Sequence, residues 1–99
     1  MIDNNIVVWG LGNHARKKII PSIINSKEYN LFGVCSRNTR LIKSVSAELN
    51  CFCWSDPITM LNTENFNTVF ISTPIGTHFK FSKMALESNK NVICEKPLT

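Results

Sequence analysis

Apolar residues along the chain alternate between short unbroken runs and stretches that repeat every three or four positions. The unbroken runs cover residues 6–9, 31–35, 51–54, 69–71 and 92–94. Short apolar runs without polar alternation are typical of strands that are covered on both faces. The pattern therefore predicts five buried strands, which are most simply parallel.

The segments between these runs carry apolar residues at helical spacing, as at Leu41, Ile42, Val45 and Leu49. Four helices are expected, and three of them have a candidate N-terminal cap. These caps are Asn38 or Thr39, then Asp56 before Pro57, and finally Thr77. Pro21 lies inside the first helical pattern, where its missing N–H should kink or interrupt the helix.

Strands that alternate with helices predict an α/β fold. We expect a Rossmann-type doubly wound parallel sheet with helices on both faces. The chain has 99 residues, which is enough for one small domain spanning residues 1–99.

Charge and composition argue against two classes of binding partner, nucleic acids and membranes. The formal net charge is +4, and the basic residues are scattered apart from the run at 16–18, with no interleaved aromatic residues for base stacking. We therefore expect no nucleic-acid partner. No apolar run approaches the roughly 20 residues of a membrane helix, and no signal peptide is visible at the start of the sequence. The expected location is the cytoplasm, without a membrane partner.

Four cysteines occur, Cys35, Cys51, Cys53 and Cys94, each within an apolar run. There is no Cys-x-x-Cys pair and neither histidine is close to a cysteine in sequence, so a zinc site is poorly supported. Free buried thiols are the expectation, with no metal site.

The first chemical motif follows the first apolar run. Gly10, Gly12 and Ala15, with Asn13 and His14 between them, fit the pattern Gly-x-Gly-x-x-Gly/Ala and open a helix. Gly10 permits a tight turn, Gly12 lets the backbone approach a pyrophosphate, and Ala15 allows close packing of the helix. The free N–H groups at the helix start would face the phosphates. The alternative is a tight turn without a ligand.

The end of the second run would meet the adenosine ribose. NAD enzymes of this fold usually place an acidic residue there, but residues 34–38 contain none. Ser36 and Arg37 can both donate to a phosphate, and Arg40 could assist. The expected cofactor is therefore NADP rather than NAD. The alternative is that both arginines are ordinary surface cations.

Two further motifs follow the fourth and fifth runs, at the edge where a doubly wound sheet binds its ligands. Thr73 and Pro74 lead to His78, which can donate to a ribose or substrate, or can be a packing residue. Glu95, Lys96 and Pro97 follow the fifth run. Lys96 can polarise an oxygen or hold a ribose, while a solvated Glu95–Lys96 pair is the alternative.

Taken together and in order, these motifs resemble the amino-terminal NAD(P)-binding domain of the glucose–fructose oxidoreductase and inositol dehydrogenase family (Gfo/Idh/MocA). The resemblance spans nearly the whole chain and is most recognisable over residues 85–98. It implies that Thr73, Pro74 and His78 run beside the nicotinamide, and that Lys96 is the catalytic lysine near the reacting carbon. It also implies a cis peptide bond before Pro97. Ile75 departs from the asparagine that often follows the proline in relatives.

The family likeness implies a dehydrogenase that acts on the CH–OH group of a sugar, a cyclitol or a related small molecule. Relatives continue beyond this chain with more of the first domain and then a substrate domain that carries the proton-transferring residue. We therefore expect the sheet to be incomplete at its carboxyl end, the chain to be inactive alone, and the exposed edge to favour a homo-oligomer. The alternatives are a non-catalytic nucleotide-binding or sensing module and, less favoured, a plain interaction fragment.

Overall fold

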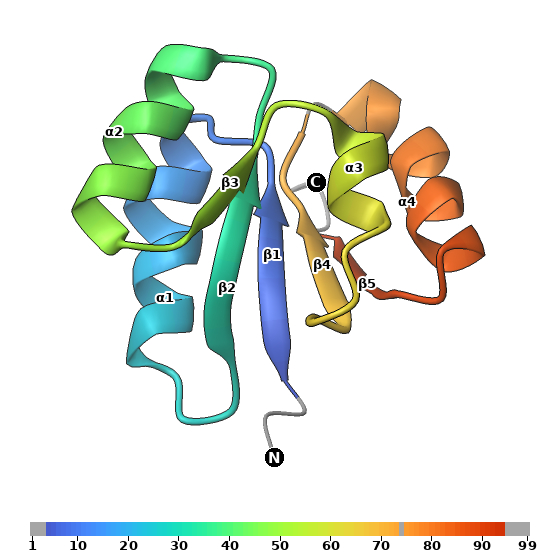
Figure 1. Ribbon diagram of the computed structural model, residues 1–99, viewed down its shortest axis with the longest axis horizontal. Coiled ribbons are helices and arrows are strands. Elements are labelled where there is room, and N and C mark those ends of the chain that lie inside the picture. Colours follow the sequence, from blue (N-terminus) through green and yellow to red (C-terminus); the bar gives the residue numbers. More distant parts are fainter. Residues whose placement is uncertain (1–3, 74, 95–99) are drawn as a thin grey trace.

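The computed structural model describes residues 4–73 and 75–94. Five strands form one parallel sheet in the order β3-β2-β1-β4-β5 (Figure 1). The strands are β1 (Asn5–Trp9), β2 (Asn30–Cys35), β3 (Phe52–Trp54), β4 (Thr68–Ile71) and β5 (Asn91–Cys94). The strand order reverses between β1 and β4, which is the switch point where doubly wound sheets bind ligands. The expected fold class is therefore confirmed.

Helices cover both faces of this sheet, as Figure 1 shows. One face carries the turn η1 (Ala15–Ile19) with α1 (Ile20–Asn25), and α2 (Thr39–Leu49). The other face carries α3 (Pro57–Leu61), and α4 (His78–Glu87) preceded by the short turn η2 (Ile75–Thr77). Two separate apolar cores result, because Ile6 and Val8 of β1 face the first layer while Val7 and Trp9 face the second.

The helical stretch continues through Pro21, so the predicted break is absent, and the irregularity is a change of turn type just before the proline. The N–H of Ile20 donates to the carbonyl of Ala15, five residues back, so the turn before the proline is wider than an α-helical turn. Pro21 then lies in the first turn of α1, where a missing N–H is tolerated. One continuous helical stretch thus follows the glycine motif and ends at Asn25.

The predicted caps are confirmed at two helices and wrong at the third. Asn38 caps α2 by accepting the N–H groups of Arg40 and Leu41, and Asp56 caps α3 by accepting that of Ile58. Thr77 occupies the cap position of α4 but makes no side-chain capping bond. Its hydroxyl is directed to another partner, described below.

The third strand departs from the expected burial. β3 is an edge strand, and both Phe52 and Cys53 are exposed, so the prediction that this run is covered on both faces is wrong. Cys35 is buried and Cys51 is half-buried, and all three thiols are free. Within residues 4–73 and 75–94 no group of His, Cys, Asp or Glu side chains is arranged to hold a metal ion.

Gly33 lies in β2 next to a register shift that separates the pairs Ile6–Leu31 and Val7–Gly33. A Cβ on Gly33 would stand 2.5 Å from the Trp54 ring and 2.8 Å from the Phe52 carbonyl oxygen. Trp54 therefore occupies the space that a side chain on Gly33 would need.

No helix in the described part of the chain is long and apolar enough to cross a membrane.

Candidate functional site

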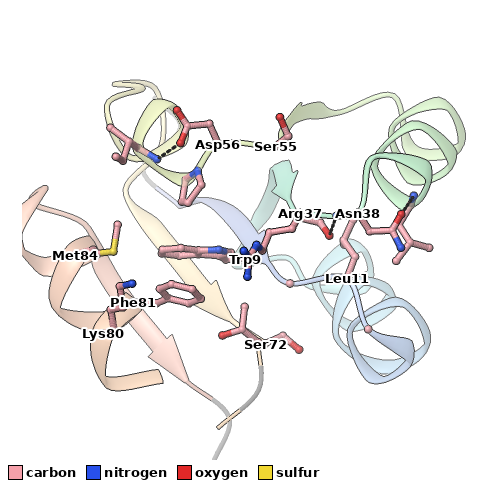
Figure 2. Close-up of a pocket in the computed structure, with 17 residues that line it drawn as sticks. Trp9, Leu11, Arg37, Asn38, Ser55, Asp56, Ser72, Lys80, Phe81 and Met84 are labelled. Carbon is pink, nitrogen blue, oxygen red and sulfur yellow. Dashed lines mark hydrogen bonds between the residues drawn. The ribbon is translucent and has the colours of Figure 1, made fainter. Parts of the chain in front are cut away.

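A cleft of about 780 Å³ opens at the carboxyl ends of the strands. The segments that follow β1, β2, β3 and β4 form its floor and sides, and α4 supplies one wall (Figure 2). Parallel strands bring these four connections to the same edge of the sheet, which explains why residues so far apart in sequence meet. The residues that line the cleft are Trp9, Gly10, Leu11, Gly12, Ser36, Arg37, Asn38, Leu41, Ser55, Asp56, Pro57, Ile58, Ser72, Thr73, Lys80, Phe81 and Met84.

The glycine loop joins β1 to the first helix beneath this cleft. Gly10 has a φ of +109°, a region that side chains rarely adopt, and its N–H donates to the Cys35 carbonyl at 2.8 Å. Gly12 is different, because a Cβ there would meet nothing within 4 Å. Gly10 is therefore required by the fold itself, whereas Gly12, which lines the cleft, has open space where a Cβ would stand.

The residues after Gly12 start the helix. Ala15 is fully buried in the first core, while Asn13 and His14 are exposed. Arg16 closes the loop, since its Nη2 donates to the Asn13 side-chain oxygen at 2.7 Å and its Nε donates to the Leu11 carbonyl at 3.1 Å. Sequence reasoning missed this role of Arg16 and noted the residue only as part of the basic run at 16–18. The signal is an arginine one helical turn after Gly12.

Ser36, Arg37 and Asn38 follow β2 and all line the cleft. Ser36 Oγ accepts the Asn38 N–H at 3.1 Å, which leaves the hydroxyl hydrogen for another acceptor. Arg37 is exposed, and Figure 2 shows its side chain directed into the cleft on the side of Trp9. Arg40 lies outside the lining.

Asp56 is the acidic residue in the lining, and its carboxylate is already engaged. One oxygen accepts the Ile58 N–H at 3.2 Å, and the other accepts the Thr59 hydroxyl at 2.9 Å. The carboxylate thus belongs to the start of α3 rather than to the connection after β2. The positive charge near the end of β2 comes from Arg37.

An apolar wall forms the remaining side of the cleft, and sequence reasoning did not foresee it. The rings of Trp9 and Phe81 are stacked with centroids 4.1 Å apart and planes 18° apart. Met84 lies on the same helix and also lines the cleft (Figure 2). Trp9 is at the end of β1, and the sequence indicated only that it was a strand residue. The signal for a site was an aromatic side chain directly before Gly10.

The connection after β4 is held by side chains at the start of α4. His78 Nε2 lies 2.7 Å from the Thr73 carbonyl oxygen, and the Thr77 hydroxyl donates to Thr73 Oγ1 at 2.7 Å. Because a carbonyl only accepts, His78 carries its hydrogen on Nε2. Thr73 lines the cleft but His78 does not. Pro74 lies outside the described residues.

Glu95, Lys96 and Pro97 also lie outside the described residues, and so does the peptide bond expected to be cis. β5 pairs with β4 in parallel, with Cys94 opposite Ile71. The chain therefore leaves β5 at the same edge of the sheet as Ser72, which lines the cleft.

Cys35, at the end of β2, is not a candidate nucleophile for the cleft. Burial raises the pKa of its thiol to about 12, with a smaller contribution from the charge of Asp56.

Comparison with known proteins yields one family. The model of the Gfo/Idh/MocA family, described as an oxidoreductase family with an NAD-binding Rossmann fold, matches residues 4–99. A dTDP-3,4-didehydro-2,6-dideoxy-alpha-D-glucose 3-reductase from Saccharopolyspora spinosa is 28% identical over 94 residues. That match covers 95% of this chain and 28% of the reductase, so the chain spans little more than a quarter of this relative.

Solved structures agree on the fold. A 3-ketoreductase from Actinomadura kijaniata, in complex with TDP-benzene and NADP, superposes with a TM-score of 0.89 at 21% identity, covering 98% of this chain and 31% of that one. The apo scyllo-inositol dehydrogenase from Lactobacillus casei gives a TM-score of 0.87 at 24% identity, covering 97% and 29%. At these identities the likeness is one of fold.

Proposed function

Since this chain belongs to the Gfo/Idh/MocA oxidoreductase family, we propose that its cleft binds NADP in preference to NAD. We further propose that it is the nucleotide-binding part of a dehydrogenase acting on the CH–OH group of a sugar, a cyclitol or a related small molecule. The whole enzyme's substrate and proton carrier belong to a second domain in this proposal, and the 99-residue chain alone is inactive.

The observation that carries the cofactor preference is the connection after β2. Arg37 is directed into the cleft, and residues 34–40 contain no carboxylate (Figure 2). An acid at this point would bind the ribose 2′-hydroxyl and repel a 2′-phosphate, whereas a guanidinium can hold a phosphate through two parallel hydrogen bonds. The Ser36 hydroxyl hydrogen offers one more donor.

The rest of the cleft fits the rest of the dinucleotide. The open space beside Gly12, with the N–H groups of Asn13, His14 and Ala15 at the helix start, suits a pyrophosphate. The partly exposed Phe81, backed by the buried ring of Trp9, and Met84 suit the apolar face of adenine. The cleft is also large enough for a ligand of this class.

When bound, NADP supplies the hydride chemistry, and the chain's residues orient it. Thr73, Pro74 and His78 belong to the segment beside the nicotinamide half in this proposal. Lys96 is the proposed catalytic residue, stabilising charge on the reacting oxygen, with Glu95 and Pro97 fixing its direction. These last assignments rest on the resemblance of residues 95–97 to a motif of the family, whose model matches residues 4–99.

Ligand titration tests the cofactor proposal directly. Isothermal titration of the chain should give a lower Kd for NADPH than for NADH, and a lower Kd for 2′,5′-ADP than for 5′-AMP. Arg37→Ala should remove most of both differences, about tenfold or more, because one charged hydrogen-bonding partner of the phosphate is lost. Lys43→Ala, an exposed cation on α2, is the matched control and should change neither. Tighter binding of NADH by the unaltered chain would overturn the proposal.

The catalytic proposal needs a longer protein that includes the second domain. There, Lys96→Ala should lower kcat strongly while the Kd for NADPH changes little. A non-catalytic sensing module would show no turnover in either form.

A further inference from the structure

Three contacts hold Thr73 in place although it lies in a loop. Its carbonyl accepts His78 Nε2 at 2.7 Å, and its hydroxyl oxygen accepts the Thr77 hydroxyl at 2.7 Å. Its backbone also packs against the glycine loop, since a Cβ on Gly10 would lie 2.9 Å from the Thr73 nitrogen. A loop residue held by backbone, side chain and packing has little freedom to turn.

The bond from Thr77 leaves Thr73 with a defined chemical capacity. A hydroxyl that accepts a hydrogen bond still has its own hydrogen to donate, and Thr73 lines the cleft. Thr77 stands at the cap position of α4, where a threonine hydroxyl normally accepts a backbone N–H and stabilises the helix by about 1 kcal/mol. Its side chain makes no such bond. The hydroxyl is used on Thr73 instead, which favours a role in the cleft over one in helix stability.

From this geometry we propose that His78 and Thr77 are positioning residues that hold the Thr73 hydroxyl as a hydrogen-bond donor to the nicotinamide half of the bound dinucleotide. This inference rests on the proposed function, because it concerns the same cleft. His78 acts through Thr73 and does not itself contact the cofactor. Ser36 and Arg37, which are proposed to hold the 2′-phosphate, follow β2 and make no contact with this triad, while Phe81 and Met84, proposed to face adenine, lie further along α4.

Two ligands separate the halves of the cleft. NADPH carries the nicotinamide half, whereas 2′,5′-ADP carries only the adenosine half with its phosphates. His78→Ala should raise the Kd for NADPH about tenfold, the effect of one lost hydrogen bond in a buried contact, and should leave the Kd for 2′,5′-ADP within about twofold. Thr73→Val, which removes the hydroxyl at nearly constant shape, should do the same.

His78→Gln supplies a side-chain N–H donor in place of Nε2 and should restore most of the NADPH affinity. Lys83→Ala, an exposed residue of α4, is the control and should change neither Kd. A general structural defect would raise both Kd values together, and that result would overturn the inference, as would an unchanged ratio of the two in His78→Ala and Thr73→Val. If His78→Ala fails to fold, Thr73→Val and His78→Gln decide the question. Failure of the unaltered chain to bind 2′,5′-ADP would instead overturn the proposed function.

Discussion

Gly10 faces the backbone of Ser72 so closely that a Cβ on Gly10 would stand 2.8 Å from the Ser72 carbonyl carbon. The two residues follow β1 and β4, the strands on either side of the switch point. The absence of a side chain at Gly10 therefore lets the two connections that form the cleft floor touch. Ser72 is secured in turn by its N–H, which donates to the Trp9 carbonyl at 2.8 Å.

This contact predicts that alanine substitutions at the two glycines of the motif have different effects. Gly10→Ala combines a positive φ with a backbone clash, so we expect a loss of stability of about 2 kcal/mol or more. Gly12→Ala adds a methyl group into open space and should leave the urea midpoint nearly unchanged. It should nevertheless weaken NADPH binding, because the methyl group lies where the pyrophosphate is proposed to approach. Equal destabilisation by both substitutions would contradict this distinction.

The apolar wall predicts a difference between two phenylalanines of one helix. Phe81 stacks on Trp9 and lines the cleft, whereas Phe79 is 82% exposed. Phe81→Ala should raise the Kd for 2′,5′-ADP about tenfold, because adenine loses a stacking surface, while Phe79→Ala should not change it. Titration of both variants measures this, and an unchanged Kd in Phe81→Ala would exclude the wall from base binding.

The buried thiol of Cys35 predicts an alkaline loss of stability. Burial raises the pKa of Cys35 from 9.0 to about 12, so between these values the unfolded chain releases a proton that the folded chain keeps. The contribution of the buried, protonated Cys35 thiol to the free energy of unfolding is complete below pH 9. It declines as pH rises toward 12, by at most about 1.4 kcal/mol per pH unit. Urea unfolding at pH 8 and pH 10 should therefore show a smaller decline for Cys35→Ala than for the unaltered chain. Cys53→Ala, at an exposed thiol, should keep the full decline.

Lys90 lies just before β5, at the amino ends of the strands and away from the cleft, so its substitution should affect stability without affecting binding. Its ammonium donates to the carbonyls of Thr63 and Phe66 at 2.7 and 2.9 Å and lies 4.0 Å from the centre of the Phe66 ring. Burial lowers the pKa of Lys90, and the charge of Glu64 partly opposes this. Lys90→Met would leave both carbonyls without this donor, so we expect a loss of about 1–3 kcal/mol in urea unfolding with an unchanged Kd for NADPH. Lys83→Met, at an exposed site, is the control, and an equal effect there would contradict the prediction.

Much of the fold could be predicted because its determinants are local. Unbroken apolar runs identified the five strands, and Asn38 and Asp56 identified two helix starts, since a cap involves only the next three residues. Pro21 marked the irregular turn for an equally local reason, its missing N–H. The prediction for Cys53 was wrong because edge or centre position in a sheet depends on strand order, which no local pattern records.

The features of the candidate site likewise divide into those set by neighbouring residues and those set by tertiary contacts. The sequence by itself determined the glycine loop, the absence of an acid after β2 and the alternation of strands and helices, because steric freedom, charge and period are properties of neighbouring residues. Only the tertiary structure decided that Phe81 stacks on Trp9, that His78 bonds to the Thr73 carbonyl, and that Gly10 meets Ser72. These contacts arise where separate connections of a parallel sheet converge. Their partners are set by packing the two helical layers, a sum of many weak contacts over the whole chain.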